Sequence, residues 1–177
     1  TPALPAGTNG LRLQATFGDL CVASNPAALT CNPFASINVT FTDASGNLVA
    51  VRNPVMHLSR VGSQLLSGVT PILGFGVTQT LTSAGATLGA PTAGSDGLSV
   101  SGSTISPIVS PGTVIDCATV SGGNVAGCGS IPISGTISNL AFDIGALRDN
   151  TTTAWDAATS VFDAWYLTFS FDEDFGD

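Results

Sequence analysis

Apolar and polar residues alternate along several short stretches of the chain. The clearest are residues 11–17, where Leu, Leu, Ala and Phe alternate with polar residues, and residues 36–42, where Ile37, Val39 and Phe41 do so. A period of two is typical of a β-strand that buries one face. Further strands are expected at intervals of about ten residues: 55–61, 72–81, 98–105, 113–119, 131–138, 140–146 and 161–171.

A hairpin is expected over residues 36–52. Its turn is the sequence TDASGN, Thr42–Asn47, between two apolar runs. The Asp43 side chain can accept a hydrogen bond from the backbone two residues on, and Gly46 readily adopts a positive φ. The segment resembles hairpins of secreted bacterial immunoglobulin-like and pilin-like sandwich domains, which implies a fold of that kind.

Gly, Pro, Ser or Asn marks nearly every junction between the expected strands. One segment, residues 154–161, begins with a pattern like a capping box and favours a short helix; a turn into the last strand is the alternative. We predict an all-β protein: a single-domain β-sandwich, jelly-roll or Ig-like, of about 8–10 strands with at most one short helix near 154–161. The sandwich would comprise residues 11–177, after an extended N-terminal arm of residues 1–10.

Two segments differ from the rest in composition. Residues 82–112 are rich in Ser, Thr, Gly, Ala and Pro, which fits either a flexible linker or thin strands with small side chains. In the last expected strand the apolar residues alternate: Trp165, Leu167, Phe169 and Phe171. We expect it to be the central strand of the core, or a strand inserted into a neighbouring subunit.

The low content of charged residues excludes some classes of protein. Of 177 residues, 44% are hydrophobic and 9% are charged, against about 25% charged in an average domain. There is no lysine, and the net charge is -8. This composition argues against disorder and against nucleic-acid binding, which needs a basic face. No apolar run reaches the roughly 18 residues of a membrane span, so the chain is not expected to span a membrane.

The four cysteines form two local pairs. The spacing favours disulfides Cys21–Cys31 and Cys117–Cys128, because short loops close at low entropic cost. Two long-range bridges, free buried thiols and a metal site are the alternatives. Disulfides imply an oxidising compartment. With a first residue other than Met, this predicts an extracellular or cell-surface protein, secreted, with its signal peptide removed.

The sequence offers little for catalysis. His57 is the sole histidine, no G-x-S-x-G motif accompanies it, and alternation puts it on the polar face of a strand. Asp143 and Asp163 lie in apolar segments, so we expect one of them to be buried with a raised pKa. Asp43, Asp96 and Asp149 adjoin turn residues and are expected to cap turns or stay solvated. We predict that the protein is not an enzyme and needs no cofactor.

Two kinds of modification or ligand site are suggested. The acidic cluster near the end of the sequence supplies the oxygen ligands that calcium takes, although a solvated acidic tail is the alternative. Its members are Asp172, Glu173, Asp174 and Asp177. Asn38 and Asn150 each begin an N-x-[ST] sequon and are candidates for glycosylation.

Few charges and much apolar surface suggest that the domain meets other copies of itself. We expect a structural subunit of an extracellular filament, pilus-like fibre or surface layer, assembling as a homopolymer through apolar contacts and β-strand donation. Four residues are candidates for that contact: Leu4, Leu11, Leu13 and Phe17. The alternatives are a secreted adhesin or carbohydrate-binding module that exposes Trp155 or Trp165, and a viral or phage coat subunit.

Overall fold

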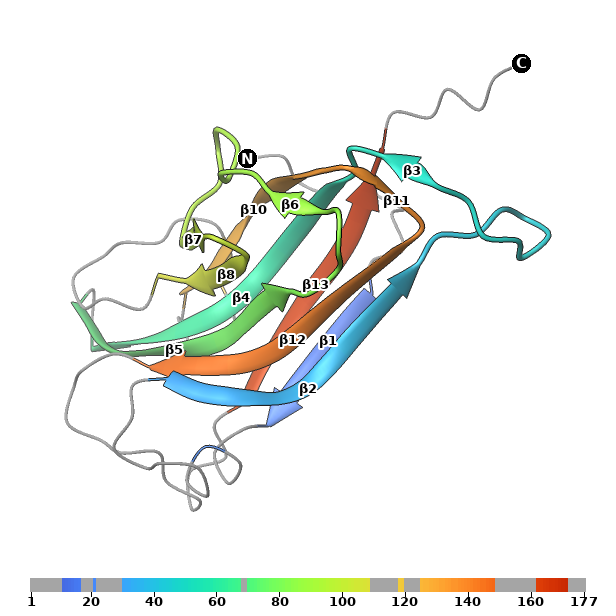
Figure 1. Cartoon of the computed structure of the whole chain (residues 1–177). Coiled ribbons are helices and arrows are strands. Elements are labelled where there is room, and N and C mark those ends of the chain that lie inside the picture. The colour runs from blue at the N-terminus through green and yellow to red at the C-terminus, as the bar shows by residue number, and fades with distance from the viewer. Residues whose placement is uncertain are drawn as a thin grey trace.

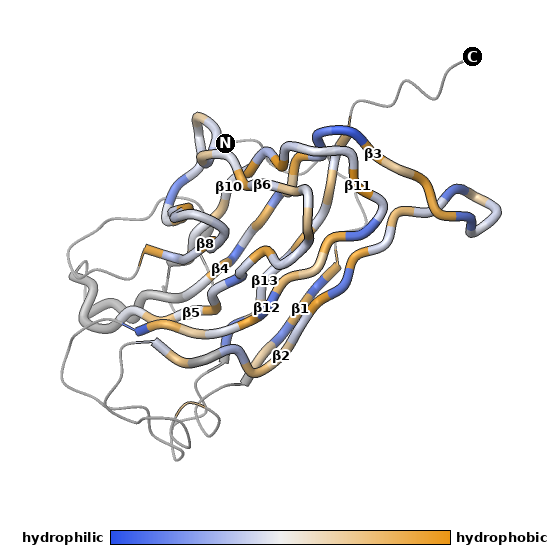
Figure 2. Tube along the Cα trace, in the orientation of Figure 1, coloured by the Kyte–Doolittle hydropathy of each residue, from blue (hydrophilic) through white to orange (hydrophobic). Residues whose placement is uncertain are grey.

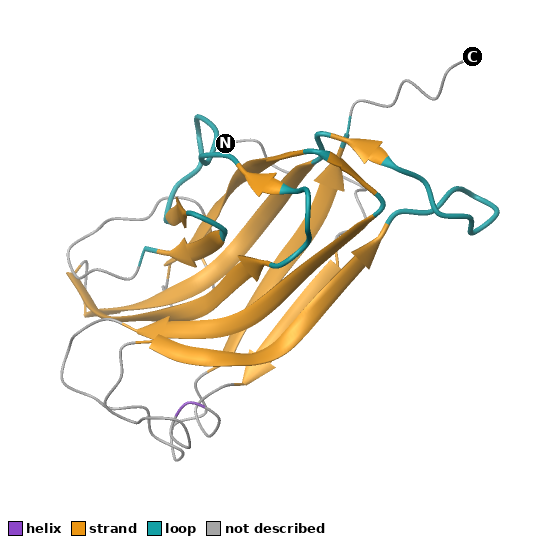
Figure 3. Cartoon of the chain, in the orientation of Figure 1, coloured by secondary structure: helices purple, strands orange, loops and turns teal. Residues whose placement is uncertain are grey.

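The computed structural model describes residues 11–16, 21, 30–67, 70–108, 118–119, 125–148 and 162–171. Most of these residues belong to antiparallel β-strands (Figures 1 and 3). The predicted all-β, sandwich-like fold is confirmed. The predicted N-terminal arm, residues 1–10, and the predicted helix near 154–161 lie outside the described residues.

The described chain contains thirteen strands. They are β1 (Leu11–Thr16), β2 (Thr30–Thr40), β3 (Val51–Arg52), β4 (Val55–Ser67), β5 (Thr70–Leu81), β6 (Thr87–Leu88), β7 (Leu98–Ser101), β8 (Thr104–Pro107), β9 (Ala118–Thr119), β10 (Val125–Ser134), β11 (Thr136–Ile137), β12 (Asn139–Arg148) and β13 (Phe162–Ser170). The number exceeds the predicted range because β3, β6, β9 and β11 have only two residues each.

The long strands follow the order β1-β13-β4-β5-β12-β2. β4 changes partner along its length, because Val55–Ser59 pairs with β13 and Ser63–Ser67 pairs with β5. β10 pairs with β4, and β8 pairs with β5 and β7. The first layer therefore comprises β1, β13, β10 and the start of β4. The second layer comprises β2, β12, β5, β8 and β7 (Figure 1).

The core lies between these layers. Alternating residues of β4, β10 and β13 are buried on one side, and alternating residues of β5, β8 and β12 on the other; all join one apolar cluster. The largest fully buried side chains include Trp165, Met56, Ile131, Ile133, Phe142, Leu140, Ile144 and Ile105. Figure 2 shows the same alternation of hydrophobic and hydrophilic residues along the strands. The period-two pattern of the last strand is thus confirmed, and β13 is an interior strand beside the edge strand β1.

A fork opens where β4 leaves β13 and joins β5. Arg60 and Gly62 have positive φ values of 62° and 72° there. A Cβ atom on Gly76 of β5 would lie 2.5 Å from the Gly62 Cα atom and 2.7 Å from Pro107. The two strands therefore approach each other closely at a glycine pair before they separate. The buried Asp163 carboxylate accepts hydrogen bonds from both arms of this fork.

The predicted hairpin over residues 36–52 forms only at its turn. Asp43 Oδ1 accepts from the backbone N–H groups of Ser45 and Asn47 at 2.8 and 2.9 Å, as expected. The following strand, β3, does not return along β2; it pairs with β11 in a separate two-stranded sheet. The returning chain stays beside β2 only as far as the Thr42–Leu48 bridge and the Val49 N–H, which donates to the Phe41 carbonyl at 3.0 Å; it then diverges to β11.

Other predicted boundaries also change. Residues 98–105 were expected as one strand, but β7 and β8 form a hairpin there because Gly102 turns the chain at a φ of 58°. β10 begins at Val125, before the expected start at residue 131. Within residues 82–108 the chain forms thin strands, β6 to β8, rather than a linker. Of the expected strand 113–119, only β9 lies in the described part.

Candidate functional site

The candidate site is the outer edge of the second layer, where β2 ends the sheet. β12 pairs with one edge of β2, and no described strand pairs with the other. Pro33 and a register shift opposite Ile144 and Ala146 interrupt the first part of this strand. From Ala35 to Thr40 the register is regular. We call the outer side of Ala35–Thr40 the β2 edge.

The β2 edge presents backbone hydrogen-bonding groups. In an antiparallel ladder, alternate residues direct their N–H and C=O groups toward the same neighbour. The Phe41 N–H donates to the Ser138 carbonyl at 3.0 Å. The backbone groups of the odd-numbered residues of β2 therefore point toward β12. Ser36, Asn38 and Thr40 consequently direct their backbone groups outward, and their side chains are exposed.

The β2 strand lacks charged side chains, one of the usual protections of an exposed edge. β2 contains no acidic or basic residue along its whole length. Folded proteins usually guard an exposed edge strand with lysines, prolines, bulges or a covering segment, because unpaired backbone groups bind other strands. Pro33 and the register shift guard the beginning of β2 only. The β2 edge is therefore suited to accept another strand.

The opposite end of the sheet is β1. β1 pairs with β13 on one side, and no described strand pairs with its other side. Leu11 was expected on a buried face, but it is 53% exposed because β1 lies at the margin of the first layer. Leu13 is partly buried against the core. Among the candidate contact residues, Leu4 and Phe17 lie outside the described residues.

His57 lies on the polar face of β4, between the buried Met56 and Leu58, as predicted. Its Nδ1 atom lies 2.8 Å from Ser130 Oγ on β10, and its Nε2 atom lies 2.7 Å from Ser170 Oγ on β13. Both ring nitrogens are thus used by serines of the two neighbouring strands. Burial lowers the pKa of the imidazole. One imidazole thus connects β4 to both β10 and β13.

Asp163 is the buried one of the two aspartates in apolar segments, as expected from the sequence. It is 3% exposed, and its Oδ2 atom accepts from the backbone N–H groups of Gly62 at 2.8 Å and Val77 at 3.0 Å. Burial raises its pKa to about 6, while these hydrogen bonds and one from the Ala164 backbone oppose the rise. Asp163 therefore satisfies backbone donors that the separating strands leave without ladder partners. Asp143 is only half-buried.

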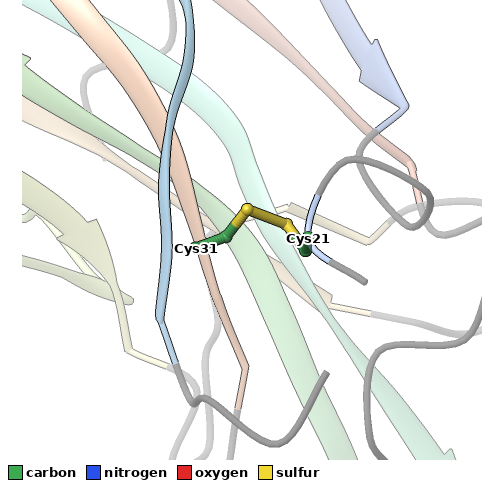
Figure 4. The surroundings of a disulfide bond; sticks show 2 residues. All are labelled: Cys21 and Cys31. Atoms are coloured by element: carbon green, nitrogen blue, oxygen red, sulfur yellow. A yellow bond between two sulfur atoms is a disulfide. The ribbon is translucent and has the colours of Figure 1, made fainter. Parts of the chain in front are cut away.

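The local disulfide Cys21–Cys31 is present (Figure 4), with a Cα–Cα distance of 5.2 Å. It ties the start of β2 to Cys21 and confirms the first predicted pair. Cys128 also takes part in a disulfide. Cys117, its predicted partner, lies outside the described residues.

The remaining predicted sites divide between exposed, buried and undescribed positions. Asn38 is exposed, which glycosylation at its sequon would need. Trp165 is 2% exposed and belongs to the core, so it offers no aromatic platform to a sugar. The described residues hold no group of three metal-ligating side chains. The other predicted residues lie outside the described part: Asp149, Asn150, Trp155, Asp172, Glu173, Asp174 and Asp177.

One surface cluster was not predicted from the sequence. Arg12 lies directly across from Tyr166 in the β1–β13 register. The Arg60 guanidinium carbon lies 5.5 Å from the centre of the Tyr166 ring. Both arginines are exposed and the tyrosine is half-buried. We call these three residues the arginine–tyrosine patch; they are far apart in the sequence, so no local pattern indicated them.

No protein-family model, no curated protein and no solved structure matches the chain. The described residues contain no helix with the length and apolar character needed to cross a membrane.

Proposed function

We propose that this protein is a structural subunit that self-associates through the β2 edge and builds an extracellular filament or surface layer. The observation that carries the proposal is a regular, charge-free edge strand with no partner among the described strands. The disulfide Cys21–Cys31 is compatible with secretion. The proposal includes no chemical reaction.

A head-to-tail contact accounts for both ends of the sheet. β1 is six residues long, the same length as Ala35–Thr40, and each lacks a described partner on its outer side. If β1 of one subunit pairs with the β2 edge of the next, the sheet continues across the boundary between subunits. This is β-augmentation by a second copy. A contact between two different surfaces that does not close into a ring produces a fibre.

The test places a charge on the β2 edge. Asn38→Lys and Thr40→Lys alter exposed side chains beside the outward backbone groups, and charged edge residues oppose strand addition. Ala84→Lys, in an exposed turn between β5 and β6, is the matched control. We expect the edge variants to raise the concentration at which light scattering detects assembly by at least about tenfold, which is about 1.4 kcal/mol.

Electron microscopy of the same samples should show fibres or sheets for the parent and Ala84→Lys proteins only. Closed shells would favour the coat-subunit alternative. A parent protein that remains monomeric at millimolar concentration, or edge variants that assemble like Ala84→Lys, would refute the proposed function.

A further inference from the structure

The arginine–tyrosine patch concentrates positive charge on an acidic protein. The chain has four arginines, no lysine and twelve acids. Two of the four arginines adjoin Tyr166: Arg12 is its cross-strand partner on β1, and the Arg60 guanidinium lies over its ring. A pair of like charges at one place is unfavourable unless an anion joins them.

Neither guanidinium has a carboxylate partner within the described part of the chain. Arg12 donates to the Gln14 side chain at 3.0 Å, and Arg60 lies over the Tyr166 ring. Both arginines are exposed, so N–H donors that these contacts do not use are open to a ligand. Arginine presents five donors in a planar fork that matches a carboxylate. The patch is thus arranged to bind carboxylates.

We propose that the arginine–tyrosine patch binds the acidic segment of a second copy, residues 172–177. This inference rests on the proposed self-association and names a second contact between subunits. The segment reads Asp-Glu-Asp-Phe-Gly-Asp and contains four of the twelve acids of the chain. Its charge complements the two arginines, and Phe175 supplies an apolar group beside Tyr166.

A second copy suits the patch better than the same chain does. The acidic segment begins one residue after Phe171, and Tyr166 lies five residues before Phe171 on β13. Tyr166 lies about 17 Å back along the strand from Phe171, and six fully extended residues span about 20–22 Å, so within one chain only the far end of the segment could reach this ring, after an immediate reversal. A neighbouring subunit needs no such reversal. One such contact is weak alone, but it strengthens assembly when the β2 edge is also engaged.

The first experiment measures peptide binding to the arginine–tyrosine patch under conditions in which the protein does not assemble. A fluorescent peptide of residues 171–177 is titrated into the full chain carrying Asn38→Lys, Asp172→Asn, Glu173→Gln and Asp174→Asn, so that edge pairing and the chain's own acids do not compete. Adding Arg12→Gln and Arg60→Gln should weaken peptide binding at least about tenfold, and salt should weaken it further. Arg52→Gln, at an exposed arginine of β3, is the control and should leave binding unchanged.

Equal binding by the Arg12/Arg60 and Arg52 variants would overturn the proposal. So would tighter binding of polygalacturonate than of the peptide, which would make the patch a site for an acidic polysaccharide. In the full-length parent, the three segment substitutions should raise the assembly threshold. An effect of these substitutions that is independent of protein concentration would show a contact within one chain and refute the intersubunit contact.

The two proposals fail in different ways. Assembly that depends on Asn38 but not on Arg12 and Arg60 would keep the proposed function and remove the patch contact. If the protein binds the peptide but never assembles, the patch is a carboxylate-binding site and the proposed function is refuted.

Discussion

At the scale of single residues, Asp163 shows how a buried charge serves the backbone. Gly62 and Val77 belong to strands that separate, and their N–H groups would be unsatisfied in an apolar core without the carboxylate. Since Oδ2 accepts both bonds, Oδ1 can take up a proton without breaking either of them. Asp163 is therefore a structural acceptor that tolerates both protonation states.

This arrangement predicts an unusual dependence of stability on pH. The native pKa of Asp163, about 6, exceeds the reference value of 3.8, so the native state binds this proton more tightly than the unfolded state. Its contribution to the unfolding free energy should increase as pH falls from 7 to 4, by about 2 kcal/mol. Asp163→Asn should lose this increase. Urea denaturation of both proteins between pH 4 and 7 measures it.

Two comparisons make this measurement specific. The lowered pKa of His57 works in the opposite direction, because the unfolded state protonates first and stability falls below its reference pKa of 6.5. That contribution is shared by the parent and Asp163→Asn, so it cancels in their difference. Asp143→Asn removes the same charge from a half-buried position of β12 and serves as the control. A constant difference between parent and Asp163→Asn across the pH range would contradict the account.

At the scale of elements, the fork between β4 and β5 depends on two glycines. A Cβ atom on Gly76 would lie 2.5 Å from the Gly62 Cα atom, a contact with backbone that cannot move aside easily. Gly76→Ala should therefore cost about 2–3 kcal/mol, as overpacking does. Gly102→Ala, at a φ of 58° with open space around it, should cost only about 1 kcal/mol. Chemical denaturation ranks the two variants, and equal costs would exclude close strand approach as the cause.

The Cys21–Cys31 disulfide anchors the start of β2. Its sequence separation is 10 residues, for which loop entropy predicts about 3 kcal/mol of stabilisation. The paired change Cys21→Ala and Cys31→Ala should lower the unfolding free energy by about that amount. The same measurement on the parent under reducing conditions is not equivalent, because Cys128 is disulfide-bonded too. A loss below about 1 kcal/mol would show that β12 pairing alone holds β2.

Sequence patterns predicted those features of the fold that depend on residues close together in the chain. Alternation around Trp165 and Leu167 indicated a strand with one buried face, and Asp43 with Gly46 indicated a turn, because both depend on neighbouring residues. Pairing partners were not predictable in this way. β3 pairs with β11 rather than with β2, and Arg12, Arg60 and Tyr166 meet only through the register of three strands. The candidate site followed from knowing which strand ends the sheet.

At the scale of the whole molecule, the chain carries a net charge of -8, so the proposed assembly would have to overcome the mutual repulsion of its subunits. Backbone hydrogen bonds at the β2 edge involve no net charge, so salt should help them by screening this repulsion. Contacts between the arginine–tyrosine patch and an acidic segment should weaken with salt for the same reason. The two proposed interfaces therefore predict opposite changes in the strength of association when salt is added.

Removing the patch separates these responses. In the variant with Arg12→Gln and Arg60→Gln, only the repulsion depends on charge, and each subunit is two charges more negative. Its assembly threshold, measured by light scattering, should fall steadily as salt rises from about 10 to 150 mM, over which the screening length shortens from about 30 to 8 Å. The parent should respond less, because screening also weakens its patch contact. Since backbone pairing itself is uncharged, a variant threshold that rises with salt would mean that ion pairs outside the patch hold the subunits together.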